Sequence, residues 1–276
     1  MVNGYAPQTL KDALEIRQRE LVTPYAGGTD LMVDHRRSGS YLFLHRISDL
    51  KTIQIDDTYL RIGACCTFTQ VREHPETPEI LKQAISRIAA PAIRNLGTIG
   101  GNIGNGSAKA DSVHVLFALD AKLRLQSADG ARVIGIKEFY KGRKELDLAP
   151  NELITEILIP RTASGYYVYH KIGARAALAI SRLSFAGLWT VEDGTITACA
   201  TAFGAIEQIV VRKPEIDQIL IGTRVAEMDE AGGRYLEAYA NALNPIDGRI
   251  SAAYRKTVCM NLLADFIEQI KKREAR

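Results

Sequence analysis

The sequence predicts an α+β protein of two domains, and three features of its 276 residues support this fold class. Short β-prone runs alternate with helical patterns up to about residue 160. Two longer β-prone runs follow, and helical patterns fill the rest of the chain, an order typical of α+β folds. Between the halves, Thr162-Ala163-Ser164-Gly165 has the composition of a linker directly after Pro160. We therefore predict domains at residues 1–163 and 164–276.

The first domain begins with a helix for which Thr9 is the expected N-cap, with Asp12 as the acid of a capping box. Further helices are predicted from their periodicity at residues 67–73, 78–89 and 112–119. Strands are predicted from β-prone composition at residues 22–26, 41–44, 52–55, 60–62, 121–126 and 152–159. Residues 95–110 are rich in Gly, Asn and Ser and are predicted to lack regular structure. Such a long loop inside a compact domain is usually functional.

The second domain is predicted to open with a β-hairpin. Residues 180–191 and 195–203 are β-rich, and Asp193-Gly194 between them is a strong signal for a tight turn. Helices follow, the last at residues 251–272. Its basic end suits the negative end of a helix dipole, so we assign no partner to it.

Composition excludes several classes of function. With 35 basic and 32 acidic residues, the net charge of +3 gives no argument for a nucleic-acid or membrane surface. No apolar run reaches the ~20 residues of a membrane helix, and the N-terminus lacks the pattern of a signal peptide. The cysteines form no C-x-x-C pair and are expected to be reduced and buried in a cytoplasmic protein. Neither they nor the histidines have the spacing of a metal or catalytic site.

Two glycine-rich segments are the candidate ligand-binding elements. The first glycine loop is Ala26-Gly27-Gly28-Thr29-Asp30, directly after a predicted strand. Glycines let successive backbone N–H groups approach an anion, and Thr29 and Asp30 can donate a hydroxyl and cap a following helix. Taken alone, two glycines after a strand are more often a plain turn.

The second glycine loop, residues 97–107, places glycine at 97, 100, 101, 104 and 106. Ile99 and Ile103 indicate that part of it is packed, so its backbone needs hydrogen-bonding partners, which a ligand rich in acceptors would supply. A phosphate-binding loop is excluded because Ser107-Ala108 follows where Lys-Ser/Thr is needed. A dinucleotide-binding G-x-G-x-x-G is excluded because Lys109 takes the third glycine position. A diphosphate held by two separate glycine loops remains. Asp111, just beyond, either accepts hydrogen bonds from sugar or ribityl hydroxyls or caps the helix that follows.

These motifs, in this order, resemble the FAD-binding subunit of the molybdenum hydroxylases, a family that includes the medium subunits of xanthine dehydrogenase and carbon monoxide dehydrogenase. The resemblance rests on both glycine loops, Ile93-Arg94-Asn95, Ala110-Asp111 and Tyr169-His170-Lys171-Ile172-Gly173, and it reaches Ser251-Ala252-Ala253-Tyr254-Arg255 near the end. It implies a vanillyl-alcohol-oxidase-type (PCMH-type) FAD-binding domain. A smaller α+β domain of the CO-dehydrogenase flavoprotein type would follow.

The resemblance also implies which residues bind FAD, without a covalent link. Ala26, Gly27, Gly28, Thr29 and Asp30 would line the diphosphate. A second wall would consist of Thr98, Gly100, Gly101, Asn102 and Asn105. Asp111 would reach the ribityl chain, Ile154 would pack near the flavin, and Lys171 would lie near its ring. A lone Lys after a strand is otherwise usually a solvated charge. Ala179 departs from the family pattern, which commonly has Asp at this position near the outer face of the flavin.

The function implied by the resemblance is that of an oxidoreductase subunit. It would take electrons from the [2Fe-2S] clusters of a small partner subunit and pass them to an acceptor such as NAD. A large partner subunit would carry the molybdenum cofactor and the hydroxylation site. Two alternatives remain, a free-standing flavin-dependent oxidoreductase of the same fold and a noncatalytic interaction subunit without flavin. We expect no catalytic acid, base or nucleophile and no metal site in this chain, and no nucleic-acid or membrane partner.

Overall fold

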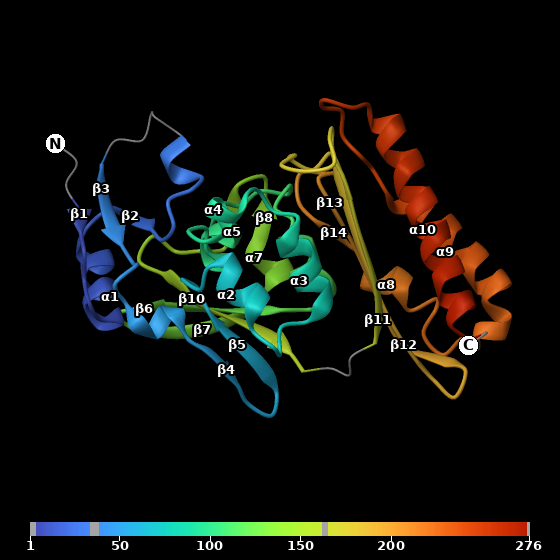
Figure 1. The fold of residues 1–276 in the computed structure, drawn as a ribbon, viewed down its shortest axis with the longest axis horizontal. Coiled ribbons are helices and arrows are strands. Elements are labelled where there is room, and N and C mark those ends of the chain that lie inside the picture. Colours follow the sequence, from blue (N-terminus) through green and yellow to red (C-terminus); the bar gives the residue numbers. More distant parts are fainter. Residues whose placement is uncertain (1–3, 34–38, 162–164, 275–276) are drawn as a thin grey trace. The chain divides into compact units, whose positions relative to one another are not determined.

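The computed structural model describes residues 4–33, 39–161 and 165–274 (Figure 1). By contacts the chain divides into two compact units. Unit 1 comprises residues 1–107 and 120–161, and unit 2 comprises residues 108–119 and 162–276. The short segment 108–119 thus joins the second unit although it lies in the first half of the sequence. Residues 162–164 of the predicted linker 162–165 lie outside the described residues.

Unit 1 begins with a small parallel sheet covered by a helix. The sheet has the order β1-β3-β2, from strands Gly4–Tyr5, Ser40–Phe43 and Val22–Tyr25. Helix α1 (Leu10–Arg19) has Thr9 as its N-cap, whose hydroxyl accepts a hydrogen bond from the Asp12 backbone N–H at 3.1 Å, as the sequence predicts. Among the described residues, no bond from the Thr9 N–H to the Asp12 carboxylate completes the predicted capping box. Ala13 and Leu14 of α1 pack against Val22 and Leu42 in a common core. Strand β2 leads directly into the first glycine loop.

The main sheet of unit 1 is antiparallel, with the order β4-β5-β10-β6-β7. Its strands are Ile53–Ile55, Tyr59–Gly63, Leu153–Pro160, Lys122–Ser127 and Gly130–Gly135. The other helices of this unit are α2 (Phe68–Glu73), α3 (Glu79–Ser86), α4 (Pro91–Arg94), α5 (Ile99–Gly104) and α7 (Ile136–Phe139). A two-stranded hairpin, β8 (Tyr140–Gly142) and β9 (Glu145–Leu146), and short 3-10 turns at Leu31–Val33 and Ser48–Lys51 complete it. Both halves of a capping box form at α2, between Thr67 and Gln70.

Unit 2 contains one antiparallel sheet, β11-β12-β13-β14, with two long helices along one side (Figure 1). Its strands are Tyr166–Ile172, Leu183–Glu192, Thr195–Gly204 and Val211–Arg212. Its helices are α6 (Val113–Ala118), α8 (Pro214–Asp217), α9 (Met228–Ala242) and α10 (Ala252–Glu274), with a 3-10 turn at Val225–Glu227. The predicted hairpin is present, since Glu192 pairs with Thr195 and both Asp193 and Gly194 have positive φ angles.

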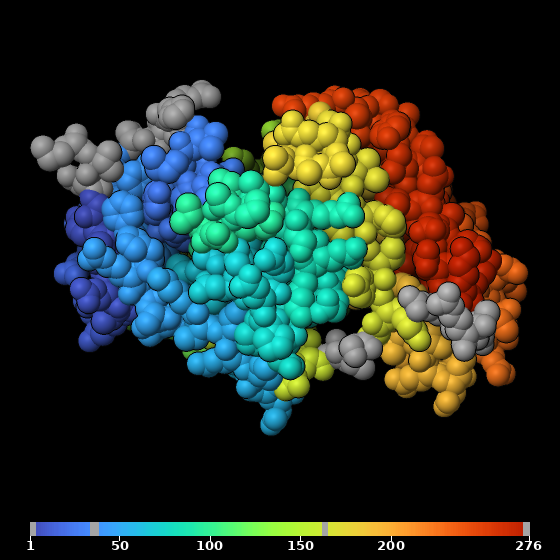
Figure 2. Space-filling view, in the orientation of Figure 1, coloured from blue at the N-terminus to red at the C-terminus, as the bar shows by residue number. Residues whose placement is uncertain are grey.

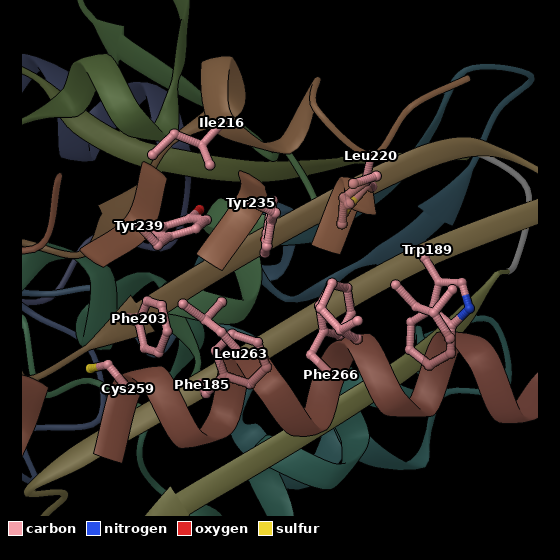
Figure 3. Packing of buried hydrophobic residues seen from close by; sticks show 14 of the residues in the cluster. Phe185, Trp189, Phe203, Ile216, Leu220, Tyr235, Tyr239, Cys259, Leu263 and Phe266 are labelled. Carbon is pink, nitrogen blue, oxygen red and sulfur yellow. The ribbon is translucent and has the colours of Figure 1, made fainter. Parts of the chain in front are cut away.

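The core of unit 2 is rich in aromatic side chains (Figure 3). Phe185, Trp189 and Phe203 of the sheet face Tyr239 of α9 and Phe266 of α10. Trp189 and Phe266 meet edge to face, with ring centroids 5.4 Å apart. Aromatic pairs of this kind add to the free energy gained from burial of their large apolar surfaces, and they hold the helices on the sheet.

The prediction that residues 95–110 lack regular structure holds for residues 95–98 and 105–110 and is wrong for residues 99–104. Residues 99–104 form α5, and Thr98 is its N-cap. Three of the six helical residues are glycines, each costing about 1 kcal/mol relative to Ala, so propensity alone gives no helix. The helix forms because tertiary hydrogen bonds and the Thr98 cap offset that cost, as described next.

Candidate functional site

The first glycine loop leaves strand β2 through a backbone turn that requires glycine. Gly28 has φ +69°, and a Cβ built on it would lie 2.1 Å from the Tyr25 hydroxyl oxygen. The Met32 N–H then donates to the Gly28 carbonyl at 2.9 Å, which begins the 3-10 turn after the loop. A side chain at residue 28 would disrupt this turn, since positive φ is readily adopted only by glycine.

Four consecutive backbone donors of this loop are available to a ligand. In the part of the chain that the structure describes, the N–H groups of Gly27, Gly28, Thr29 and Asp30 donate to no protein acceptor. The first three residues are partly exposed and Asp30 is exposed. Successive unpaired N–H groups in a turn carry partial positive charge and attract anions. The loop therefore fits an anionic group such as a diphosphate.

The second glycine loop differs from this, because its own fold provides partners for most of its backbone N–H groups. The Thr98 hydroxyl accepts from the Gly101 N–H at 3.1 Å, and the Gly100 N–H donates to the Ala64 carbonyl at 2.9 Å. Gly100 packs so closely that a Cβ would lie 2.5 Å from that of Ala64. α5 and its neighbours therefore supply most of the hydrogen-bonding partners that the sequence argument assigned to a ligand.

The two glycine loops lie in contact within unit 1. A Cβ on Gly27 would fall 1.9 Å from the Leu96 carbonyl oxygen, just before the second loop. A Cβ on Gly97 would lie 3.3 Å from the Thr29 hydroxyl oxygen, and one on Gly101 would lie 4.0 Å from the Ala26 Cβ. In Figure 2, the blue atoms around the first loop adjoin the blue-green atoms that precede the second. The structure thus brings together two segments separated by about 70 residues.

Ile154 also belongs to this group of residues. It lies on β10, beside a register shift of that strand, and its Cδ1 would be 3.7 Å from a Cβ on Gly104. Its side chain is buried against α5. The predicted residues that lie in unit 1, within the two glycine loops or on β10, are Ala26, Gly27, Gly28, Thr29, Asp30, Thr98, Gly100, Gly101, Asn102, Asn105 and Ile154.

Asp111 and Lys171, the other two predicted site residues, meet in unit 2. The Lys171 Nζ lies 2.6 Å from one Asp111 carboxylate oxygen, and the Ser181 hydroxyl donates to the other at 2.5 Å. Both charged side chains are 8% exposed, so Lys171 is not a solvated surface charge. Burial raises the pKa of Asp111, while Lys171 and Ser181 oppose that rise. The Asp111 carboxylate does not cap the following helix, since its hydrogen bonds go to Lys171 and Ser181 and Ser112 is the N-cap residue. Each carboxylate oxygen can still accept a second hydrogen bond.

Ser181 and His114 extend this buried polar cluster, and neither was predicted from the sequence. Lys171 pairs across the sheet with Ser184, whose hydroxyl lies 3.3 Å from Nδ1 of His114. Complete burial lowers the pKa of His114 to about 3, so its ring stays neutral. These residues come together through the docking of segment 108–119 in unit 2 and the register of β11 and β12, and no spacing along the chain could have indicated the cluster.

Ala179, at the position that departs from the family pattern, lies in an exposed connection between β11 and β12. The Arg175 guanidinium donates to the carbonyls of Ala177 and Leu178, at 3.1 and 2.6 Å, and thereby orders this segment. Gly173, at the start of this segment, packs against Ala179, since a Cβ on Gly173 would lie 2.8 Å from the Ala179 Cβ. The segment offers a methyl group where a carboxylate is common.

Other types of site find no support among the described residues. They contain no group of three or more His, Cys, Asp or Glu arranged to hold a metal ion. They also contain no helix that is long and apolar enough to cross a membrane. All four cysteines are buried free thiols, and burial raises the pKa of Cys65 to about 12.

Families of known proteins match nearly the whole chain. The family described as "FAD binding domain in molybdopterin dehydrogenase" matches residues 1–162, and the "CO dehydrogenase flavoprotein C-terminal domain" matches residues 168–270. The nicotinate dehydrogenase FAD-subunit of Eubacterium barkeri is 28% identical, with 97% of this chain and 96% of that protein covered. A putative xanthine dehydrogenase FAD-binding subunit of Escherichia coli is 32% identical, with 76% of each covered. Reconstituted CO dehydrogenase from Oligotropha carboxidovorans has a chain with TM-score 0.90 and 25% identity, which covers 99% of this chain and 98% of that one.

The fold and the paired glycine loops therefore define a flavoprotein subunit of the oxidoreductase type. The chain belongs to the family of FAD-binding subunits of the molybdenum hydroxylases. FAD is the cofactor of this family, and the residues present fit it. The first loop offers four open donors for a diphosphate, and a Cβ at Gly27 or Gly28 would clash with neighbouring protein atoms.

Proposed function

We propose that this chain is the electron-transfer subunit of a molybdenum-containing hydroxylase. It takes electrons from the [2Fe-2S] clusters of a small partner subunit and passes them to an acceptor such as NAD. A large partner subunit holds the molybdenum cofactor, where the substrate is hydroxylated. When bound, FAD supplies the redox chemistry, and the protein contributes binding, orientation and electrostatics.

The observation that carries the proposal is the row of open donors in the first glycine loop, against which the second loop packs. In the proposed site, the N–H groups of Gly27, Gly28, Thr29 and Asp30 donate to the diphosphate. Thr98, Gly100, Gly101, Asn102 and Asn105 form the second wall, and Ile154 supplies apolar contact near the flavin. The predictions that Asp111 reaches the ribityl chain and that Lys171 lies near the ring stand as part of this proposal.

The proposed placement of the metal centres on partner subunits is consistent with the side chains of the described residues. No three metal-ligating side chains gather in them, and we propose that partner subunits hold the iron–sulfur clusters and the molybdenum. Relatives named as a medium chain and as a subunit of a dehydrogenase complex support the existence of such partners. We assign no acid, base or nucleophile to this chain. The four buried free thiols suit a reducing compartment, and we propose that the protein works in the cytoplasm.

The first experiment identifies the flavin. The purified full chain is denatured, the supernatant is chromatographed, and the apo-chain is titrated with FAD and with FMN. We expect FAD alone to bind tightly, because FMN lacks the diphosphate bridge. A chain that took up FMN instead, or no flavin after reconstitution, would contradict the proposal, and the latter result would favour the noncatalytic alternative.

A second experiment separates the subunit from a free-standing enzyme. The chain is purified with an affinity tag from its own cells, and co-purifying molybdenum and iron are measured. We expect both metals with the complex, and no hydroxylation of purines, aldehydes or aromatic heterocycles by the isolated chain. Turnover of such a substrate by the metal-free chain alone would favour the free-standing oxidoreductase.

A further inference from the structure

The C-terminal end of α5 is held by a hairpin that lies elsewhere in the sequence. The Tyr140 hydroxyl, at the start of β8, donates to the Ile103 carbonyl at 2.9 Å, and both residues are buried. Ile103 is 37 residues away along the chain. The same carbonyl accepts the Gly106 N–H at 3.0 Å, so two donors converge where α5 ends.

The turn of this hairpin contacts the next residues of the second glycine loop. Lys144, between β8 and β9, donates its N–H to the Gly106 carbonyl at 3.3 Å. A Cβ on Gly106 would lie 3.0 Å from the Lys144 Cα, and Gly106 has φ +65°. Lys144 itself has φ +59°, which is unusual for a residue with a side chain. Both the start and the turn of the hairpin therefore lie against the exit of the loop.

The base of the hairpin is anchored independently of the loop. Arg132 donates to the Asp147 carboxylate at 2.8 Å and to the Glu152 carboxylate at 2.7 Å. The Asp147 N–H donates to the Phe139 carbonyl at 2.8 Å. The hairpin thus has its own attachment to β7 and to the segment before β10, and it can act as a support for α5.

We propose that Tyr140 is a positioning residue for the FAD site, through its hydrogen bond to the end of α5. This inference rests on the proposed function. A helix of six residues with three glycines does not hold its shape alone, and its start is fixed by Thr98 and Ala64. Tyr140 fixes its other end, and so keeps the wall that carries Gly101 and Asn102 at its distance from the first glycine loop.

The test compares Tyr140→Phe with Tyr235→Phe in the full chain. Tyr140→Phe keeps the buried ring and removes only the hydroxyl. We expect its FAD affinity to fall about 3- to 10-fold, or about 0.7–1.4 kcal/mol, as for loss of one buried neutral hydrogen bond. The control, Tyr235, is a fully buried tyrosine of unit 2 whose hydroxyl lies 2.8 Å from the Thr201 Oγ1. Tyr235→Phe should lower the melting temperature and leave FAD affinity unchanged.

Hydrogen–deuterium exchange of the apo-chain gives a second readout that is independent of FAD. Exchange in the peptide with residues 101–106 should accelerate in Tyr140→Phe and stay at the wild-type rate in Tyr235→Phe. Unchanged FAD affinity in Tyr140→Phe would overturn the inference, whether or not exchange accelerates. A loss of affinity that appears equally in Tyr235→Phe would also overturn it, because that pattern reports general destabilisation. If the wild-type chain bound no FAD, the proposed function itself would fall, and this inference with it.

Discussion

Gly101→Ala and Gly104→Ala form a matched pair that tests whether α5 is a wall of the FAD site. Both substitutions gain about 1 kcal/mol of helix propensity, so this contribution cancels in the comparison. They differ in what the new methyl group meets. On Gly101 it would lie 2.8 Å from the Thr98 hydroxyl oxygen and on the side of Ala26, whereas on Gly104 it makes an ordinary contact of 3.7 Å with Ile154.

The magnitude follows from these contacts. To admit the Gly101 methyl, Thr98 must rotate and lose its cap bond to residue 101, which costs about 1 kcal/mol, or α5 must shift from its position. The cap loss and the propensity gain nearly cancel in the stability of the fold. A misplaced methyl in a packed site costs about 1–3 kcal/mol, which corresponds to about 5- to 150-fold in FAD affinity.

The assay is titration of the apo-protein with FAD, followed by flavin fluorescence, with circular dichroism melting as the control for folding. We expect Gly101→Ala to bind FAD more weakly at a nearly unchanged melting temperature. Gly104→Ala should bind FAD like the wild type and melt at the same or a slightly higher temperature. Equal affinities for wild type and Gly101→Ala would show that this side of α5 does not contact the cofactor, and would refute the reasoning.

Of three further predictions, two concern the buried polar cluster around Asp111, and the third concerns the contact between the two glycine loops. Lys171→Met should destabilise the protein by about 3–5 kcal/mol in chemical denaturation at neutral pH, because it leaves the Asp111 carboxylate buried without its cation. Since burial raises the pKa of Asp111, protonation stabilises the folded variant, and the deficit should shrink as pH falls; a deficit independent of pH would contradict this. Because the pKa of His114, about 3, lies below the ordinary 6.5, the free energy of unfolding of the wild type should fall by about 2 kcal/mol between pH 7 and pH 5. His114→Gln should reduce this fall in urea unfolding curves measured across that pH range. Gly27→Ala should reduce FAD binding more than Gly101→Ala, because its methyl would meet the rigid Leu96 carbonyl at 1.9 Å, and a titration that ranks the two variants in the opposite order would argue against loop contact.

Much of the fold and one half of the candidate site follow from local features of the sequence. The Thr9 cap, the Asp193-Gly194 turn and the two glycine loops are encoded within a few residues, because turns and caps depend on near neighbours in the chain. The first loop is predictable for the same reason. Positive φ at Gly28 and open donors after a strand are properties of a short segment.

Only the tertiary structure decided that part of the second glycine loop forms a helix and which buried side chains contact one another. Residues 99–104 became a helix only because Ala64 and Thr98 satisfy the backbone of a glycine-rich segment and Tyr140 supports its end. Asp111 contacts Lys171 and Ser181, which are 60 and 70 residues away, because segment 108–119 docks in unit 2 and because of the register of its sheet. Pairings of this kind depend on how distant strands align, and the free energy that selects the alignment comes from burying whole faces of the sheet, which no short stretch of sequence specifies.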